Sequence, residues 1–315
     1  MQGKSRKVVV VGVGFVGTTY VYALMKSGLA GEIVLIDKNT DRVKGEVMDL
    51  EQGQCFAPPV KIRGGDYSDC SDADLIVVTA GAKQVPGQSR LDLIQRNADI
   101  VKDICDEIAK YDSKAVMVMV ANPVDSLTQV ALQRLGWERE RLIGSGTVLD
   151  SARFRFLLSR HCGIDARNVH AYILGEHGDS EVAAWSMTHI AGVQIKEYCG
   201  MCNMCDANQK HKEIVEQVRN SAYHIIDYKG STYYAIGLSL LRIAEAILRD
   251  EKSILTVSIL LKGEYGIDDV CLSVPCVVGM GGVDRIINAK LDENEQKDLQ
   301  LSAETLRKVY RGIKL

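Results

Sequence analysis

The chain has 315 residues, of which 46% are hydrophobic and 25% are charged, and its formal net charge is -3. This length fits about two domains, and the composition is ordinary for a globular protein. Because the net charge is small and no run of Lys or Arg occurs, the sequence offers no electrostatic footprint for nucleic acid or membrane surfaces, so we expect small ligands.

The first twenty residues place Lys4, Arg6 and Lys7 before an apolar run, which could imitate a secretory signal. We reject that interpretation because glycines break the run and no convincing small-residue cleavage site follows. No segment approaches 18 uninterrupted apolar residues, so no transmembrane helix is expected. Nine scattered cysteines, an odd number, fit reduced thiols better than a disulfide framework, which favours the cytoplasm.

Residues 6–144 alternate apolar runs with helix-period segments, the pattern of βαβ units around a parallel sheet. The predicted strands are nearly continuous apolar runs, as expected of strands covered on both faces: 7–11, 32–36, 75–79 and 115–120. A helix is predicted between the last two strands, because apolar residues recur there at steps of three and four: Ile94, Ala98, Val101, Ile104 and Ile108.

Gly12, Gly14 and Gly17 match the pattern G-x-G-x-x-G directly after the first predicted strand. The first glycine permits a tight turn, the second lets the backbone approach a pyrophosphate, and the third allows close packing of helix on strand. Twenty residues after Gly17, Asp37 ends the next strand, where a carboxylate can bind the adenine ribose hydroxyls and repel a 2′-phosphate. The pattern predicts NAD rather than NADP; the alternative is that the glycines only turn the chain and Asp37 caps a loop.

After about residue 146 the segments become longer and more mixed, which predicts a second, α+β domain. We therefore expect an NAD-binding domain at 1–145 and a substrate or catalytic domain at 146–315. The fold class is α/β, with an N-terminal Rossmann doubly wound parallel sheet. The chain should end in an amphipathic helix marked by Leu299, Ala303, Leu306, Val309 and Ile313.

Two further features of the second half carry chemistry. His177 stands in the turn Gly175-Glu176-His177-Gly178-Asp179-Ser180, and hydride transfer needs a residue near neutrality that moves the matching proton. Cys199, Cys202 and Cys205 form two successive CxxC steps, which could hold a soft metal, with His211 as the nearest imidazole. We expect no metal and interpret the three cysteines as a surface loop of free thiols, which elemental analysis would test.

Six strings together resemble the lactate/malate dehydrogenase family, and within it the L-lactate dehydrogenases, over essentially the whole chain. They are 12–17, 80–92, 121–125, 149–153, 175–180 and 229–237. The resemblance implies reversible hydride transfer between NADH and pyruvate to give L-lactate, as in fermentative glycolysis. It also implies a homotetramer.

The family's pattern assigns the catalytic roles. His177 donates the proton, Asp150 holds the imidazole in the right tautomer, and Arg153 grips the substrate carboxylate with its planar guanidinium. The segment 81–90 has the Gly, Pro and polar content of a surface loop, and by resemblance it is a lid that brings Arg90 to the carbonyl oxygen. A surface Asp–Arg ion pair and a solvated loop are the structural alternatives.

Substrate choice depends on Gln84, because malate dehydrogenases of the family carry arginine there to pair the second carboxylate of oxaloacetate. Thr232 matches the family's substrate-pocket threonine, and bulkier 2-oxo acids stay open. Asn122 follows a predicted strand and could hydrogen-bond both the substrate and the nicotinamide ribose. By resemblance the other cofactor contacts are Val16, Arg42, Tyr67, Gly81, Ala82 and Ser145.

Arg155 and His170 match the positions at which bacterial members of the family bind fructose 1,6-bisphosphate between subunits. The equal alternative is a helix-surface arginine and a satisfied strand-edge histidine. For the whole chain, two other functions stay open: a related 2-hydroxy acid or malate dehydrogenase, and a dinucleotide-binding structural or sensor protein without catalysis. Gln84 argues against malate, and the set of catalytic side chains argues against a protein without catalysis.

Overall fold

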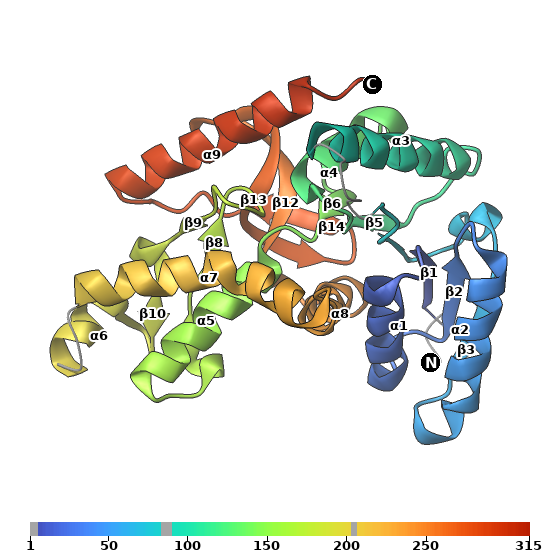
Figure 1. Ribbon diagram of the computed structural model, residues 1–315, viewed down its shortest axis with the longest axis horizontal. Helices are drawn as coiled ribbons and strands as arrows, with labels where there is room; N and C mark the ends of the chain where they lie inside the picture. The colour runs from blue at the N-terminus through green and yellow to red at the C-terminus, as the bar shows by residue number, and fades with distance from the viewer. Residues whose placement is uncertain (1–5, 83–89, 203–206) are drawn as a thin grey trace.

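The computed structural model describes residues 6–82, 90–202 and 207–315; for 90, 91, 202, 207 and 208 it describes the backbone alone. Its largest sheet has the strand order β14-β13-β12-β6-β5-β4-β1-β2-β3 (Figure 1). The parallel part consists of β1 (Lys7–Val11), β2 (Glu32–Ile36), β3 (Lys61–Gly64), β4 (Leu75–Val78), β5 (Val116–Met119) and β6 (Leu142–Gly144). The pairing β3-β2-β1-β4-β5-β6 is that of a Rossmann sheet, which confirms the predicted fold class.

Helices cover both faces of this sheet, as the continuous apolar strands predict. Alternate residues of β1 face opposite ways: Val8 and Val10 join one core, and Val9 and Val11 join another. The first core includes α1 (Phe15–Ser27), α2 (Thr40–Gln52) and α8 (Tyr234–Leu248), and the second includes α3 (Arg90–Ile108) and α4 (Val124–Leu135). All five apolar residues predicted for the helix before β5 are buried, which confirms that helix.

The sheet continues into the second half of the chain. β12 (Ser253–Lys262) pairs antiparallel with β6 through Ser258 and Gly144, and β13 (Asp268–Gly279) and β14 (Gly282–Ile286) extend it. The expected boundary at 145/146 stays a prediction, since the sheet is continuous across it. The predicted last helix is α9 (Glu293–Arg311), in which Leu299, Ala303 and Leu306 are buried; Ile313 is buried but lies beyond the helix end.

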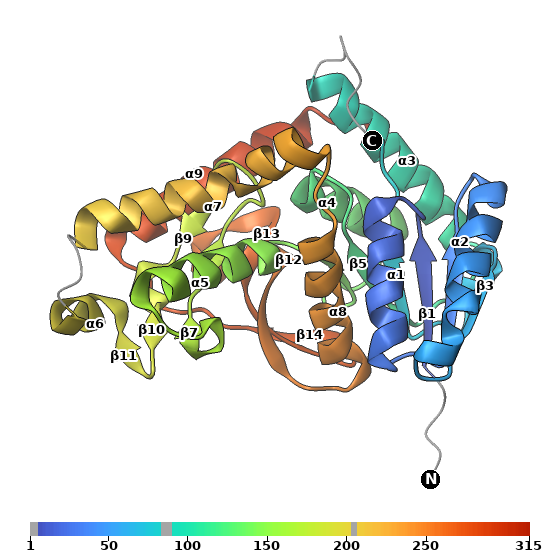
Figure 2. The ribbon, with the colours of Figure 1, turned by 60° about the horizontal axis from the view of Figure 1, so that its bottom comes forward.

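The remaining elements form a smaller layer. Helices α5 (Val148–Cys162), α6 (Ile195–Cys202) and α7 (Ala207–Lys229) lie together on the side away from α1–α3 (Figures 1 and 2). Short strands complete it: β7 (Val169–His170), β10 (His189–Ile190) and β11 (Val193–Gln194) in one sheet, and β8 (Ile173–Leu174) with β9 (Val182–Ala183) in a hairpin. The 3-10 turns are Gln54–Phe56, Tyr67–Cys70, Ala166–Asn168, Trp185–Met187 and Glu264–Gly266. Across the described residues, no helix combines the length and apolar character needed to cross a bilayer.

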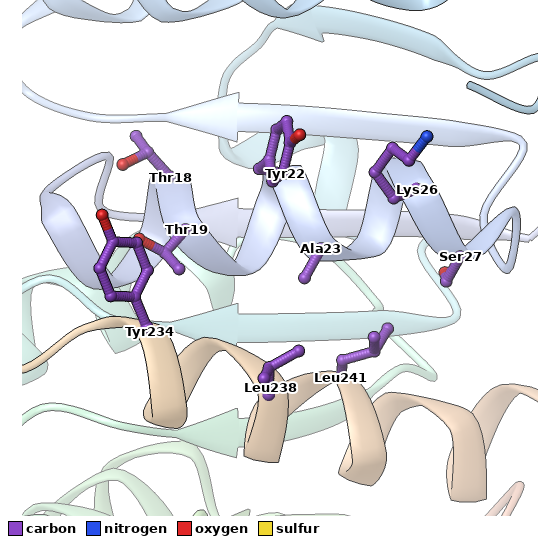
Figure 3. A pocket seen from close by; sticks show the side chains of 9 residues that line it. All are labelled: Thr18, Thr19, Tyr22, Ala23, Lys26, Ser27, Tyr234, Leu238 and Leu241. Carbon is purple, nitrogen blue, oxygen red and sulfur yellow. The ribbon is translucent and has the colours of Figure 1, made fainter. Parts of the chain in front are cut away.

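A groove of about 640 Å³ runs between α1 and α8 (Figure 3). The two helices approach closely at Gly237, where a Cβ would lie 2.8 Å from Cγ2 of Thr19. Beside this contact Tyr22, Tyr234 and Leu238 line the groove and are 60%, 66% and 61% exposed. None of the residues assigned to the cofactor or substrate lines the groove among the side chains described, so it is distinct from the predicted site.

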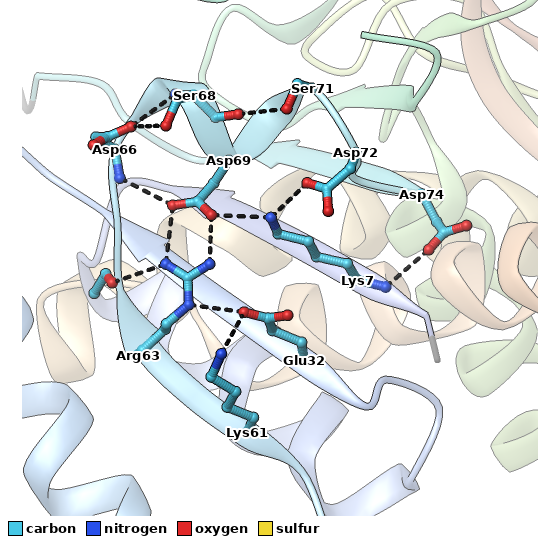
Figure 4. A network of polar contacts seen from close by, with 11 residues as sticks. Lys7, Glu32, Lys61, Arg63, Asp66, Ser68, Asp69, Ser71, Asp72 and Asp74 are labelled. Atoms are coloured by element: carbon cyan, nitrogen blue, oxygen red, sulfur yellow. Dashed lines mark hydrogen bonds and ion pairs between the residues drawn. The ribbon is translucent and has the colours of Figure 1, made fainter. Parts of the chain in front are cut away.

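A network of ion pairs ties the edge of the parallel sheet together (Figure 4). Lys7 on β1 lies 2.9 Å from Asp69 and 2.6 Å from Asp72, and Arg63 on β3 contacts both Asp69 and, at 2.7 Å, Glu32 of β2. The Arg63 guanidinium holds the pKa of the Asp69 carboxyl well below its usual range. A network of this kind stabilises more than isolated surface pairs do. It fixes the edge strand β3 and the turn that carries Tyr67.

Candidate active site

The glycine turn after β1 has the shape that a dinucleotide requires. Gly12 has φ 103°, and a Cβ there would lie 2.5 Å from the backbone N of Ala80. At Gly17 a Cβ would lie 2.0 Å from the Gly12 carbonyl oxygen, so only glycine permits this packing of α1 on β1. A Cβ at Gly14, by contrast, would meet nothing within 4 Å, which leaves the backbone open to a bulky group. Gly14 also caps α1 without a side-chain hydrogen bond, so the helix N-terminus can attract a phosphate.

Asp37 lies at the mouth of this turn, directly after β2. Its Oδ2 accepts a hydrogen bond from the backbone N–H of Val13 at 2.9 Å, and its Oδ1 accepts one from the N–H of Asn39 at 3.0 Å. A carboxylate held beside the glycine turn suits the ribose hydroxyls of NAD and opposes a 2′-phosphate. Burial raises the pKa of the nearby Tyr67 hydroxyl to about 12, and the Asp37 charge adds to that shift. The open backbone at Gly14 and the carboxylate of Asp37 therefore both suit NAD.

The other predicted cofactor residues differ in position: Val16 and Ser145 lie near strand ends, whereas Arg42 lies on a helix surface. Val16 is half-buried on α1, and Ser145 is buried where its N–H donates to the Met119 carbonyl at 2.8 Å, beyond the ends of β5 and β6. Arg42 is exposed on α2, and its guanidinium lies 3.5 Å from Glu46. Val16 and Ser145 thus lie beside strand ends of the sheet, whereas the Arg42 side chain pairs within its own helix.

One residue that sequence reasoning missed connects two parts of the site. Asn97 of α3 is 3% exposed; its Oδ1 accepts from the N–H of Ala82 at 2.7 Å, and its Nδ2 donates to the carbonyl of Asn122 at 2.8 Å. It therefore joins the loop after β4, with Gly81 and Ala82, to the loop after β5. The available signal was a polar residue beside the apolar stripe of the helix.

The catalytic group predicted from sequence comes together around Asp150, in the first turn of α5. Its Oδ2 lies 2.6 Å from Nδ1 of His177, and its Oδ1 accepts from a terminal guanidinium N–H of Arg153 at 2.8 Å. The Asp150 side chain is 3% exposed and that of His177 is 25% exposed. The Asp150 charge raises the pKa of His177 to about 9, so the imidazole is largely protonated at neutral pH. Burial opposes ionisation of Asp150, but the cationic His177 and Arg153 hold its pKa below the usual value.

The turn that carries His177 is fixed by α9. Gly175 has φ 85°, and a Cβ there would lie 2.7 Å from Oγ of Ser302. The N–H of Glu176 donates to the same Ser302 oxygen at 2.8 Å, while Oγ of Ser180 donates to Glu176 at 2.5 Å. These contacts define the path of the loop between β8 and β9, so the imidazole is presented from a rigid support.

Two buried carboxyl groups near His177 were given no role in the sequence analysis, although Asp125 ends the matching string 121–125. Asp125 in the first turn of α4 is 2% exposed and accepts a hydrogen bond from the N–H of His177 at 2.9 Å. Glu181 is 3% exposed, and burial raises its pKa to about 8, with the Asp150 charge acting in the same direction. The sequence predicts no role for either acid, because α4 and the His177 loop come into contact only in the folded chain.

Several predicted residues lie outside what the structure describes. Gln84 and the rest of segment 83–89, which is most of the predicted lid, are not described. Arg90 is described only as the first backbone position of α3. Thr232 is half-buried in the loop between α7 and α8. In the cysteine cluster, Sγ of Cys199 lies 3.9 Å from Nε2 of His211, whereas the Cys202 side chain and Cys205 lie outside the description.

The two residues predicted for an effector lie on different elements. Arg155 is on α5, where one terminal N–H donates to the Ala166 carbonyl at 3.3 Å. His170 is exposed on β7, which pairs with His189 at the edge of the small sheet. Arg155 is half-buried on its helix and His170 is exposed at a strand edge, so neither the effector site nor its structural alternative is decided by the single chain.

Comparison with known proteins gives two family matches that together cover nearly the whole chain. Residues 6–144 match the lactate/malate dehydrogenase NAD-binding domain, and residues 147–314 match the lactate/malate dehydrogenase alpha/beta C-terminal domain. The L-lactate dehydrogenase of Treponema denticola is 57% identical over 98% of this chain and 99% of its own length. L-lactate dehydrogenase 1 of Clostridium acetobutylicum is 52% identical with the same coverage of both chains.

Solved structures agree with these matches. The crystal structure of minor L-lactate dehydrogenase from Enterococcus mundtii in its ligands-bound form has a TM-score of 0.96, with 43% identity over 99% of both chains. The ligands-unbound form of that protein has a TM-score of 0.91, with 41% identity over 100% of this chain and 99% of the other. The similarity therefore spans both halves of the fold and includes every region that contributes to the predicted site.

Proposed function

This chain belongs to the lactate/malate dehydrogenase family, and on that premise we propose that it is an NAD-dependent L-lactate dehydrogenase, which interconverts pyruvate and L-lactate. The observation that carries the proposal is the placement of one buried carboxylate, Asp150, between the imidazole of His177 and the guanidinium of Arg153. A proton donor and a binder of carboxylate are the two groups that reduction of a 2-oxo acid needs side by side.

Each residue of the proposed site has a distinct role in binding the substrate or transferring the proton. Arg153 binds the substrate carboxylate, and Asn122 hydrogen-bonds the substrate from the end of β5. Protonated His177 donates from Nε2 to the carbonyl oxygen during reduction, and neutral His177 takes that proton back during lactate oxidation. Asp150 keeps Nδ1 protonated and stabilises the imidazolium. Arg90, brought in by segment 81–90, polarises the carbonyl in a site from which water is excluded.

The cofactor is assigned to the first part of the chain, 1–145, and the proton donor to 146–315. NAD(H) would be held by the glycine turn, by Asp37 at the adenosine ribose, and by the loops at Gly81, Ala82 and Ser145. When bound, it supplies or accepts the hydride. Val16, Tyr67 and Arg42 complete the proposed contacts; for Arg42 this requires its guanidinium to leave Glu46.

Substrate selection is assigned to Gln84 and Thr232. A neutral Gln84 leaves the second carboxylate of oxaloacetate unpaired in a closing site, whereas the methyl group of pyruvate needs no partner. The test is a spectrophotometric panel of pyruvate, oxaloacetate and branched 2-oxo acids with NADH and NADPH. We expect pyruvate with NADH to have the highest kcat/KM. A preference for oxaloacetate or a branched acid would show a related dehydrogenase, and no turnover of any would favour a binding protein without catalysis.

We further propose a homotetramer that works in fermentative glycolysis in the cytoplasm. The groove between α1 and α8 supports assembly, because it leaves Tyr22, Tyr234 and Leu238 exposed on one face. Analytical ultracentrifugation tests the oligomeric state, and a monomer at micromolar concentration would contradict it.

The effector proposal is that Arg155 and His170 from paired subunits bind a phosphate of fructose 1,6-bisphosphate. The exposure of His170 and the position of Arg155 on a neighbouring helix support it. Pyruvate saturation curves with and without the bisphosphate are the test. An unchanged curve would contradict the effector proposal and leave Arg155 and His170 with structural roles, on a helix and at a strand edge.

A further inference from the structure

A buried acid in the first turn of α4 contacts the loop that carries His177. Asp125 lies three residues after Asn122, and its Oδ2 accepts the backbone N–H of His177 at 2.9 Å across 52 residues of sequence. The acid is 2% exposed, so its carboxylate is shielded from water, while the hydrogen bond as a whole is part-buried. One carboxylate therefore fixes the substrate-binding loop after β5 relative to the loop that carries the proton donor.

Against the effect of burial, the Asp125 carboxylate is stabilised by the Ser258 hydroxyl and the His177 N–H, both of which lower its pKa, rather than by a basic side chain. No Lys or Arg forms an ion pair with Asp125 among the residues whose side chains are described, and the cation that its charge acts on is the imidazolium of His177. Burial raises the pKa of Asp125 to about 6, so it is ionised in the neutral and alkaline range in which His177 titrates. In a dry environment a carboxylate that forms no ion pair with a lysine or arginine favours a neighbouring positive charge.

We propose that Asp125 is a positioning residue for hydride transfer: a second buried carboxylate, besides Asp150, that holds the His177 backbone and favours the protonated imidazole. The inference rests on the proposed reaction, since it assigns a role in that site. The charged groups that interact with His177 are Asp150 and Arg153 of α5, Asp125 of α4, and Glu181. Around them, Glu176 acts on Asp125 and Arg219 of α7 acts on Glu181. Of these, Asp125 contacts the His177 backbone and lies on α4, which begins two residues after Asn122.

The test is the pH dependence of pyruvate reduction in Asp125→Asn, which keeps an acceptor for the N–H but removes the charge. The alkaline limb of kcat/KM should move down by about one pH unit. With a native limb near pH 9, activity relative to native falls about fivefold at pH 9 and is nearly unchanged at pH 6.5, where His177 is protonated in both proteins. Asp125→Ala also removes the acceptor, so its kcat/KM should fall at every pH.

Two further variants and a spectroscopic measurement complete the experiment. Asp125→Glu keeps the charge and should retain the native ratio of activities at the two pH values, even if it is less stable. Asp41→Asn is the matched control, because Asp41 is also an acid in the first turn of a helix but is exposed on α2. The titration of the His177 ring by NMR, assigned with His177→Asn, should shift down in Asp125→Asn without any substrate.

The outcomes separate the two claims. An unshifted limb and ring titration in Asp125→Asn, or a loss of the same size at every pH, would overturn the role of the charge. If the native chain did not reduce pyruvate, the proposed function would fail, while the ring titration would still decide whether Asp125 supports the imidazolium.

Discussion

Oδ2 of Asp150 and Nδ1 of His177 lie 2.6 Å apart, although 27 residues separate them in the sequence. The contact joins the first turn of α5 to the loop between β8 and β9. Thr147, just before α5, hydrogen-bonds both Ser273 of β13 and the Ile173 carbonyl of β8, so the same strands position the two partners. The pairing is therefore a property of the fold, and its consequences can be tested through the pKa of His177.

The first prediction concerns pH. Because Asp150 raises the pKa of His177 to about 9, the proton donor is charged below that value and is lost as the pH rises through it. Pyruvate reduction should therefore fall off near pH 9, and lactate oxidation, which needs the neutral base, should rise over the same range. In Asp150→Asn the limb should move toward the ordinary histidine value near 6.5. Initial rates over pH 6–10 measure this, and a limb unaffected by Asp150→Asn would refute the assignment.

The second prediction separates chemistry from binding at His177. His177→Asn removes the proton donor but leaves the glycine turn and Asp37 unchanged. We expect kcat to fall by about 10²–10⁴, the usual range for general acid–base catalysis, with little change in NADH affinity. Fluorescence titration of NADH provides the binding measurement. Near-normal turnover in this variant would remove His177 from the mechanism.

The third prediction concerns the guanidinium of Arg153. Its side chain is 12% exposed and already bonded to Asp150, so its planar shape is held for a second, bidentate contact with a carboxylate. Arg153→Lys should raise the KM for pyruvate by about 10- to 100-fold, which corresponds to about 1.5–3 kcal/mol for a charged hydrogen bond. Arg160→Lys, an exposed position on the same helix, is the control. Equal KM values for the two variants would contradict a role in substrate binding.

The fourth prediction uses two glycines of the cofactor turn. Gly17→Ala places a Cβ 2.0 Å from the Gly12 carbonyl oxygen and should destabilise the free protein by several kcal/mol, about the size of strong overpacking. Gly14→Ala meets nothing within 4 Å and should leave the unfolding temperature nearly native, yet weaken NADH binding because the methyl group occupies the approach of the pyrophosphate. Thermal unfolding and NADH titration distinguish them, and native NADH affinity in Gly14→Ala would argue against this cradle.

Sequence reasoning succeeded where the signal is local. β1 and β2 have the predicted bounds, because continuous apolar runs bounded by polar residues define buried strands. β4 and β5 are shorter than predicted, and β3 and β6 were not predicted at all, since strands of four and three residues carry too little pattern. The long strands β12 and β13 were likewise not predicted, because the pattern of the second half of the chain indicated only longer, mixed segments.

The same limit applies to the site. Gly12, Asp37 and His177 could be proposed as site residues because each lies in a short motif. The contacts of Asp125 and Asn97 could not be predicted, because Asp125 bonds to His177, 52 residues away, and Asn97 bonds to Ala82 and Asn122 in the loops after β4 and β5. Buried polar groups that serve as links between elements have no spacing rule, and only the packed structure identifies their partners.

The last prediction tests such a link. Asn97→Ala would leave the N–H of Ala82 and the carbonyl of Asn122 without their buried partner, at a cost of about 1–3 kcal/mol for each unsatisfied group. Because these groups belong to the loops that precede segment 83–89 and the first turn of α4, the loss should reduce kcat/KM for pyruvate about tenfold or more. Gln95→Ala on the same helix is the control, since within the described part of the chain its side chain bonds Asp99 and the backbone of Lys314. If both variants lost the same stability and kept native kcat/KM, Asn97 would be a packing residue, and the two loops would be positioned by the strands alone.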